Sequence, residues 1–245
     1  MAFQTVFKRC ELKYIITLQQ KEKVLAAMRP YMIPDAYGRT TIRNIYFDTD
    51  TYLLIRRSVE KPVYKEKLRI RSYTKAEPDS TVFVELKKKY EHTVYKRRIS
   101  LPEAEAMAWV ERKKECSQHT QISEEVDYFL DYYETLHPTV FLSYEREAFY
   151  AKEDSDFRVT FDDTVLCRQE DLSLEADVYG TPLLPAGTVL MEIKCAGGIP
   201  LWMTNILSAE RIYKTSFSKY GTAYQRIIYP TIKEYGVYGK SKQKL

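Results

Sequence analysis

The chain has 245 residues, of which 44% are hydrophobic and 29% are charged, and its formal net charge is +4. This composition is typical of a folded globular protein and excludes an intrinsically disordered chain. So small a net charge also excludes a protein that is basic over its whole surface, so the positions of the cations matter more than their number. The length suits one large domain or two small ones, and we expect one domain over residues 1–245.

The four cysteines are widely separated, and no CxxC or Cys/His pair occurs at zinc-binding spacing. We therefore expect free thiols in a reducing compartment. The N-terminal residues lack the apolar segment of a signal peptide, and no run approaches the ~20 apolar residues of a membrane span. These patterns predict a soluble cytoplasmic protein.

Alternation, capping and turn signals predict mostly strands in the first part of the chain, with two helical pieces. In chain order they are a strand at Phe7–Ile16, a helix at Leu18–Met32 capped by Thr17, a strand at Ile42–Asp48, a short helical piece at Tyr52–Arg57, and strands at 64–73, Val82–Lys89 and Val94–Leu101. The turn signal at Glu77–Ser80 makes a hairpin of the strands on either side of it.

The second part of the chain begins with two predicted helices, the first opened by Pro102 with acidic residues in its first turn. The predicted elements are helices at 102–115 and Ser123–Leu136, strands at Val140–Tyr150, Phe157–Phe161 and Val189–Cys195 with a short stretch near Leu166–Arg168, a helix at Met203–Lys214, and a C-terminal helix or extension. The pattern as a whole predicts an α+β protein in which antiparallel strands predominate.

Charged residues recur at every second position of these strands. In the segment KEKLRIRSY, the side chains of Lys65, Lys67, Arg69 and Arg71 share one face. In an isolated strand such a face most often points to solvent, but six further segments repeat the pattern, with apolar residues on the other face. Their polar faces carry Arg, Lys and Glu, and few Ser, Asn or Gln.

Cations held this close repel one another unless an anion or interspersed acids offset their charge. Phosphate oxygens suit such a surface, because Arg binds them bidentately and Lys binds them as a point charge. Glutamates on the same faces could hold Mg²⁺ or Mn²⁺. A sheet closed with these faces inward would form a cationic tunnel for a polyphosphate-like ligand.

The segments FKRCELKY, IRNIYFDT, LIRRSVEKPVYKEKLRIRSY, VFVELKKK, YKRRISL, SYEREAFY, FRVTFDDTV, LMEIKC and FSKY, in this order, resemble the VTC domain. This domain is the polyphosphate polymerase module of the vacuolar transporter chaperone complex, within the CYTH-like triphosphate tunnel metalloenzymes. The resemblance, to the stand-alone microbial form, covers Phe7 to Tyr220. It implies an antiparallel, roughly eight-stranded β-barrel with several flanking helices.

The resemblance also implies the site residues. The positions matched to phosphate-handling, catalytic residues are Lys13, Arg69, Arg71, Lys87, Lys96, Arg146, Arg158 and Lys219. Further substrate-binding residues are Arg56, Lys67, Arg98 and Lys194, with the choice between Arg56 and Arg57 left open. The expected ligands of a divalent metal, Mn²⁺ or Mg²⁺, are Glu192, Glu11 and Glu85.

The implied function is a metal-dependent polyphosphate polymerase, which transfers the terminal phosphoryl of a nucleoside triphosphate to a growing polyphosphate chain. The same fold could instead hydrolyse tripolyphosphate or nucleoside triphosphates, or it could bind polyphosphate without turnover. The expected partners are a nucleoside triphosphate and polyphosphate, not a nucleic acid. A membrane-protein partner, by family analogy, would place the chain at the inner face of a membrane.

Overall fold

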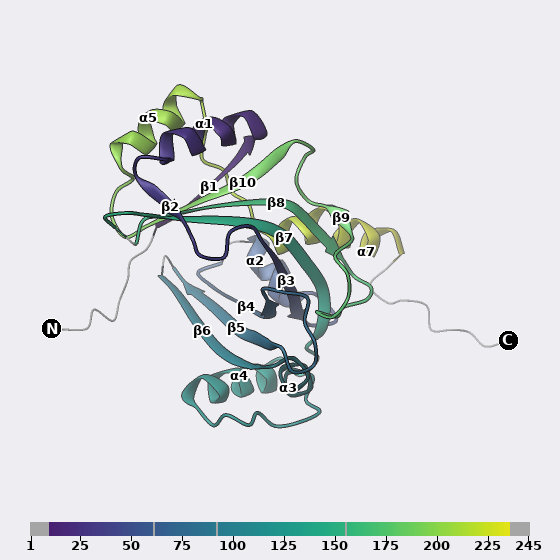
Figure 1. Ribbon diagram of the computed structural model, residues 1–245. Coiled ribbons are helices and arrows are strands. Elements are labelled where there is room, and N and C mark those ends of the chain that lie inside the picture. The colour runs from purple at the N-terminus through teal and green to yellow at the C-terminus, as the bar shows by residue number, and fades with distance from the viewer. Residues whose placement is uncertain (1–9, 61, 92, 155, 236–245) are drawn as a thin grey trace. The chain divides into compact units, whose positions relative to one another are not determined.

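The computed structural model describes residues 10–60, 62–91, 93–154 and 156–235. Its antiparallel sheet and flanking helices confirm the predicted α+β class (Figure 1). The strands are β1 (Cys10–Thr17), β2 (Met32–Pro34), β3 (Thr40–Asp48), β4 (Tyr64–Ser72), β5 (Thr81–Tyr90), β6 (Thr93–Pro102), β7 (His137–Ala151), β8 (Arg158–Arg168), β9 (Thr181–Pro182) and β10 (Thr188–Cys195). The helices are α1 (Leu18–Met28), α2 (Leu53–Glu60), α3 (Glu103–Val110), α4 (Gln121–Tyr132), α5 (Leu201–Ala209), α6 (Lys219–Ala223), the π-helix η1 (Tyr224–Ile228) and α7 (Tyr229–Tyr235).

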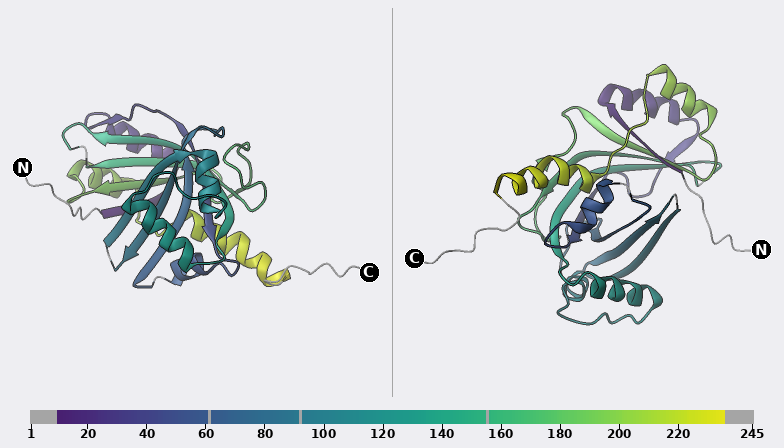
Figure 2. Two further views of the ribbon diagram at one scale, coloured as in Figure 1. Left: turned by 90° about the horizontal axis from the view of Figure 1, so that it is seen from below. Right: turned by 180° about the vertical axis from the view of Figure 1, so that it is seen from behind.

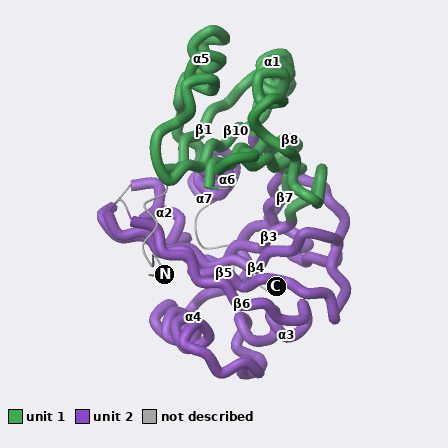
Figure 3. The backbone as a smooth tube through the Cα atoms, turned by 60° about the vertical axis from the view of Figure 1, so that its left-hand side comes forward, with its two compact units in different colours: residues 1–42, 143–165, 184–217 green, residues 43–142, 166–183, 218–245 purple. Residues whose placement is uncertain are grey.

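The chain divides into two compact units, which Figure 3 shows in different colours. Unit 1 consists of residues 1–42, 143–165 and 184–217, and unit 2 consists of residues 43–142, 166–183 and 218–245. Each unit has a hydrophobic core of its own. The single domain over residues 1–245 and the closure of the sheet into a barrel stay predictions.

The sheet of unit 1 has the strand order β1–β10–β8–β7, with β2 beside β7. The pairs of β1 with β10, β10 with β8, and β2 with β7 are all antiparallel. One face of these strands is apolar, and Tyr14, Val159 and Met191 on it are buried. Helices α1 and α5 cover this face (Figure 1). The core also contains Val24 and Met28 of α1 and Met203 and Leu207 of α5.

In unit 2 the strands β3, β4, β5 and β6 are consecutive neighbours, and each neighbouring pair is antiparallel. Leu68, Ile70 and Val84 on one face are fully buried. Helices α3 and α4 cover this face (Figures 1 and 2) and pack Trp109 and Phe129 against it. The alternate residues, which are mostly Lys and Arg, therefore lie on the opposite face of β4, β5 and β6.

Two predicted helices end earlier than expected. The predicted ends were Glu115 and Lys214, whereas α3 ends at Val110 and α5 ends at Ala209. Arg112 (φ 62°) and Arg211 (φ 52°) have left-handed backbones, and the next amide in each case bonds back to the helix, at Ala108 and Leu207 respectively. Glycine usually occupies such a helix stop, so an arginine there gives no sequence signal.

Helix α1 ends at Met28 rather than at the predicted Met32, because Pro30 has no amide hydrogen with which to continue the helix. The residues Met32–Pro34 instead form β2, which was not predicted. The two predicted strand pieces around 157–168 are one strand, β8. Helix α4 begins at Gln121, ahead of the predicted Ser123, because Thr120 and Ser123 form a capping box.

The other predicted elements correspond to helices or strands within a few residues, and residues 7–9 of the first predicted strand lie outside the described part. All four cysteines are free thiols, as predicted. Among the described residues, no helix has the length and apolar character needed to cross a membrane.

Candidate functional site

The charged side chains of the strands gather in two clusters, one in each unit. The Glu85 cluster, in unit 2, consists of Glu85, Arg69, Arg71, Lys96 and Arg98. The Glu192 cluster, in unit 1, consists of Glu192, Glu11, Lys13, Arg146 and Lys194. Both lie on the face that alternation assigned to charge, because their strand neighbours in sequence are buried in the cores.

Both carboxylate oxygens of Glu85 contact cations. Oε2 accepts hydrogen bonds from Arg69 Nε at 2.9 Å and Nη2 at 2.7 Å, and it lies 4.0 Å from Arg71 Nη1. Oε1 accepts a hydrogen bond from Arg98 Nε at 2.7 Å and lies 2.6 Å from Lys96 Nζ. The register of the sheet explains the arrangement, because Arg69, Glu85 and Arg98 are directly opposite one another on β4, β5 and β6.

The Glu85 cluster carries an excess of positive charge. Burial alone would raise the pKa of Glu85, which is only 1% exposed, but Arg69, Arg71 and Lys96 lower it well below its usual range. Burial lowers the pKa of Lys96, and Glu85 offsets only part of this effect. Four cations around one carboxylate leave a net charge of three, so the cluster favours a further anion.

A row of three lysines lies next to this cluster. Lys87 on β5 is directly opposite both Lys67 on β4 and Lys96 on β6. Lys87 and Lys96 are exposed, and Lys67 is half-buried. Like charges directly opposite each other destabilise a sheet, and phosphate oxygens would offset the repulsion.

Strand β3 fixes the two arginines of β4 in place. Arg69 Nη1 donates a hydrogen bond to the hydroxyl of Tyr46 at 2.7 Å, and Arg71 Nε donates to Asn44 Oδ1 at 2.9 Å. Asn44 is fully buried and its amide group donates to the carbonyl of Leu142 at 3.0 Å. These bonds hold both guanidinium groups in one orientation, which is what repeated binding of a phosphate requires.

In the Glu192 cluster, Lys13 lies between two carboxylates. Its Nζ is 3.3 Å from Glu192 Oε1 and 3.1 Å from Glu11 Oε1, and it donates a hydrogen bond to the carbonyl of Phe217 at 3.0 Å. The backbone carbonyl of Lys13 accepts from Thr215, so Lys13 and Glu192 form a non-hydrogen-bonded pair, in which side chains approach closely. Burial would lower the pKa of Lys13, but Glu192 and Glu11 raise it above its ordinary value.

Arg146 is bound mainly to a carboxylate that the sequence analysis did not single out. Its Nε and Nη2 donate to the two oxygens of Asp162 at 2.6 and 2.7 Å, and Asp162 is fully buried. Nη2 also lies 4.0 Å from Glu192 Oε2. Arg146, like Arg69, therefore already uses part of its donor capacity within the protein. Its phosphate-binding role stays a prediction.

The surroundings of Glu192 fit a divalent metal better than those of Glu85. Among the described residues, no three His, Cys, Asp or Glu side chains form a metal-binding group. Mg²⁺, however, often uses one or two protein carboxylates and takes its other ligands from phosphates and water. Opposite Glu192, the buried hydroxyl of Thr160 has no hydrogen-bond partner within the described part of the chain, so a polar ligand could be accommodated there. Three of the four cations at Glu85 lie within 2.7 Å of its oxygens, whereas Lys13, Arg146 and Lys194 lie 3.3–4.0 Å from Glu192.

The remaining predicted residues lie in both units. Arg158, Lys194 and Glu11 form a row across β8, β10 and β1 in unit 1. In unit 2, Lys219 is the first residue of α6. Arg56 Nη1 lies 3.4 Å from the carbonyl of Thr51 on the exposed side of α2. Burial raises the pKa of Tyr224 and of Tyr133, and the charges of Arg56 and Arg57 respectively oppose this effect.

The decisive comparison is with a family model. The model of the VTC domain matches residues 8–228. The chain belongs to the VTC domain family. No curated protein matches it.

This VTC domain is similar in fold to solved structures of low sequence identity. A candidate adenylate cyclase from Bacillus halodurans has a TM-score of 0.54 and 16% identity, over 89% of this chain and 95% of that chain. A candidate adenylate cyclase from Vibrio parahaemolyticus has a TM-score of 0.46 and 11% identity, over 89% and 98%. A candidate adenylyl cyclase from Hippeastrum with a dominant triphosphatase activity has a TM-score of 0.46 and 15% identity, over 95% of this chain and 91% of that chain. The likeness to the Bacillus protein supports the fold.

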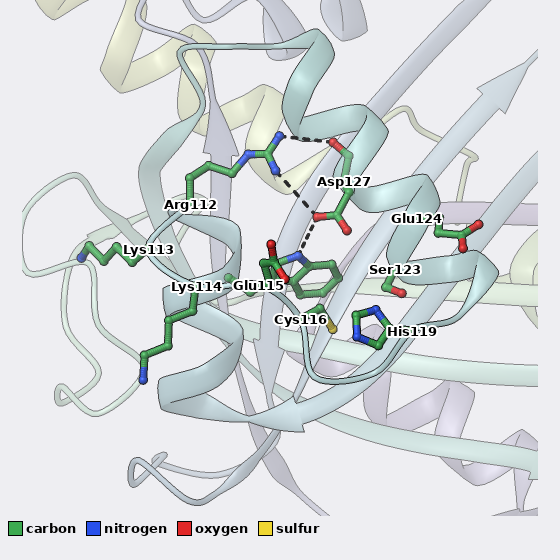
Figure 4. A pocket seen from close by; sticks show the side chains of 10 residues that line it. Arg112, Lys113, Lys114, Glu115, Cys116, His119, Ser123, Glu124 and Asp127 are labelled. Atoms are coloured by element: carbon green, nitrogen blue, oxygen red, sulfur yellow. Dashed lines mark hydrogen bonds and ion pairs between the residues drawn. The ribbon is translucent and has the colours of Figure 1, made fainter.

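One cavity of the VTC domain, of about 500 Å³, lies in the part of unit 2 built by α3, α4 and the turn between them (Figure 4). Trp109, Cys116 and His119 are among the residues that line it. The guanidinium of Arg112 there is bound to Asp127 and Asp131, while Lys113 and Lys114 point away from the other labelled side chains. None of the predicted site residues lines this cavity.

Four polar neighbours of the predicted site residues were missing from the prediction. Asn44, Tyr46, Thr160 and Asp162 all contact or face predicted residues. Thr160 and Asp162 share the polar face of β8 with Arg158, so alternation alone could have singled them out. For Asn44 and Tyr46 the signal would have been their position opposite Arg71 and Arg69, which depends on the pairing of β3 with β4.

Proposed function

We propose that this VTC domain is a polyphosphate polymerase, which transfers the terminal phosphoryl group of a nucleoside triphosphate to an inorganic polyphosphate chain. The observation that carries the proposal is the Glu85 cluster with its lysine row. There, cations held rigidly on β4, β5 and β6 outnumber the single carboxylate. The family match and the fold are in keeping with a triphosphate substrate.

Phosphoryl transfer needs positioning and neutralisation of charge more than it needs a protein nucleophile. Arg69 and Arg71 present guanidinium groups whose orientation Tyr46 and Asn44 fix, so they can hold phosphate oxygens without reorganisation. Lys67, Lys87 and Lys96 add charge along the same strands, where an extended polyanion could lie. Glu85 keeps these cations close together in the absence of substrate.

A divalent metal, Mn²⁺ or Mg²⁺, would be held by Glu192 together with Glu11, and not by Glu85. When bound, such an ion supplies positive charge to phosphate oxygens. The residues of this chain support that role, because Lys13 pairs with both carboxylates and holds them close together, and Thr160 offers a buried hydroxyl opposite Glu192. Arg146, held by Asp162, adds a fixed positive charge 4.0 Å from Glu192.

The experiment that tests the proposal is an incubation of the purified chain with ATP and MnCl₂, with the products separated by chain length. The polymerase predicts long-chain polyphosphate and ADP. Orthophosphate without longer chains would show a hydrolase and contradict the proposal. Tight binding of tripolyphosphate without turnover of ATP would instead identify a non-catalytic polyphosphate-binding module.

A further inference from the structure

A buried aspartate lies at the end of β3, where it caps the next helix. Asp48 is fully buried, and its Oδ1 accepts hydrogen bonds from the backbone amides of Thr49 and Leu54, each at 2.9 Å. Its Oδ2 accepts a third from the amide of Ile55, also at 2.9 Å. Asp48 therefore satisfies amides at the start of α2, the helix that carries Arg56.

The fourth hydrogen bond to Asp48 comes from the hydroxyl of Tyr220 in α6, 172 residues later in the chain, at 2.9 Å. Tyr220 is 2% exposed, and its ring packs against that of Tyr46, with 4.9 Å between the centroids. Burial, and then the charge of Asp48, raise the pKa of Tyr220 well above its ordinary value. The tyrosine is therefore protonated at neutral pH and acts as the donor.

This bond fixes a short segment that carries Lys219, a predicted phosphate-binding residue, and that contacts Lys67 of the lysine row. Lys219 precedes Tyr220, and Ser218 caps α6 by accepting from the amide of Gly221 at 3.2 Å. Lys67 Nζ lies 3.3 Å from Ser218 Oγ and 5.9 Å from the centroid of the Tyr220 ring. A shift of α6 would therefore move Lys219 and also change the surroundings of Lys67 in the lysine row.

Helix α6 is tightly packed within its own first turn and is in contact with α2. A Cβ atom added to Gly221 would lie 3.1 Å from Cβ of Ser218, the N-cap of α6, and at an ordinary contact distance of 3.9 Å from Val59 Cγ2 of α2. Asp48 thus connects three elements that carry predicted phosphate-binding residues or their neighbours: β3 with Tyr46, α2 with Arg56, and α6 with Lys219.

We propose that Tyr220 and Asp48 are positioning residues for phosphoryl transfer. Their hydrogen bond holds Lys219 in the orientation that binds the phosphates of the substrate. Neither residue touches the substrate in this proposal. The inference rests on the proposed function and on the predicted role of Lys219 in binding phosphate.

The test is a double-mutant cycle of Tyr220→Phe and Lys219→Ala, with kcat/KM for ATP and the Kd of tripolyphosphate measured in all four proteins. We expect Tyr220→Phe alone to lower kcat/KM and the affinity about tenfold, because a small misplacement of a binding group is costly. In the Lys219→Ala background the same change should have less than a twofold effect. Equal losses in both backgrounds would overturn the proposal, as would full activity of Tyr220→Phe.

Tyr133→Phe is the matched control, since the buried hydroxyl of Tyr133 also donates to a buried carboxylate, that of Glu66, at 2.7 Å. Both Phe variants should lower the Tm by a few degrees, but only Tyr220→Phe should change kcat/KM. If the wild-type chain has no turnover, the proposed function fails. The double-mutant cycle measured by the Kd of tripolyphosphate still tests this inference. Additive binding losses would then refute it, and non-additive losses would support it.

Discussion

Lys87 and Lys88 are neighbours on β5, but their side chains lie on opposite faces of the sheet of unit 2. Lys87 is directly opposite Lys67 and Lys96 in the lysine row. Lys88 lies on the face that α4 covers, where its Nζ is 3.7 Å from Glu125 Oε2. Two adjacent lysines of one strand therefore face opposite sides of the sheet, and only Lys87 is expected to bind phosphate.

We predict that Lys87→Ala lowers the affinity for tripolyphosphate about tenfold and leaves the free energy of unfolding unchanged or slightly higher. The affinity falls because a cation is lost, and stability is kept because repulsion with Lys67 and Lys96 is relieved. Isothermal titration calorimetry and urea denaturation measure the two quantities. Lys88→Ala is the control and should keep the wild-type affinity; a larger loss in Lys88→Ala would place the binding face on the other side of the sheet.

Glu85→Gln should destabilise the chain by roughly 2–4 kcal/mol, because removing one partner of a buried charge network leaves the others uncompensated. Tripolyphosphate should then raise the Tm of Glu85→Gln more than that of the wild type, since its oxygens replace the missing anion. Thermal unfolding with and without tripolyphosphate measures this.

Glu125→Gln is the control for this change, because Glu125 pairs with Arg97 and Lys88 on the other face of the same strands, where it is partly exposed. The loss in that variant should be about 0–1 kcal/mol. If tripolyphosphate raises the Tm of Glu85→Gln no more than that of the wild type, phosphate oxygens do not replace the carboxylate of Glu85 in this cluster.

The low pKa of Glu85 predicts how stability depends on pH. Arg69, Arg71 and Lys96 keep this carboxyl ionised in the folded chain well below its usual range, whereas in the unfolded chain it takes up a proton near pH ~4.3. Between the folded-state pKa of Glu85 and its unfolded-state pKa, the unfolded state therefore binds more protons. The stability due to Glu85 is thus present above pH ~4.3 and is lost as pH falls. The difference in unfolding free energy between wild type and Glu85→Gln should shrink from pH 6 to pH 3. A constant difference would contradict this.

We predict that Glu192→Gln lowers the rate of ATP turnover at least about 100-fold and abolishes the dependence of the rate on Mn²⁺ concentration, because a neutral amide is a poor ligand for a hard cation. The initial rate as a function of MnCl₂ concentration measures this. Glu210→Gln removes a surface carboxylate of unit 1 that pairs with Lys23, and it should behave as the wild type. If the rate of Glu192→Gln still depends on the Mn²⁺ concentration, Glu192 does not bind the metal.

Alternation in the strands was sufficient to predict which face of each sheet carries charge, because apolar residues must alternate with polar ones wherever one face packs on a core. Leu68 and Ile70 are buried and Arg69 lies on the other face, as the segment KEKLRIRSY indicated. The ends of α3 and α5, just before Arg112 and Arg211, could not be predicted, because an arginine gives no sequence signal of a left-handed backbone.

The partners of the cations depend on contacts between distant parts of the chain. The sequence could not reveal that Arg146 donates hydrogen bonds to Asp162, or that Asp48 accepts one from the hydroxyl of Tyr220, 172 residues away. The resemblance grouped Glu85 with the metal ligands, but it could not show that Glu85 lies between Arg69 and Arg98 and accepts hydrogen bonds from both. Alternation identifies a face, but only the register of paired strands determines which charges meet.

The most direct test of the central claim is the fate of the γ-phosphoryl group when ATP and Mn²⁺ are incubated with the chain in water enriched in ¹⁸O. If another phosphate is the acceptor, the phosphoryl enters polyphosphate without any oxygen from the solvent, and the ADP formed matches the polyphosphate phosphate gained. If the chain instead releases ¹⁸O-labelled orthophosphate in an amount equal to the ADP, water is the acceptor and the polymerase proposal is wrong.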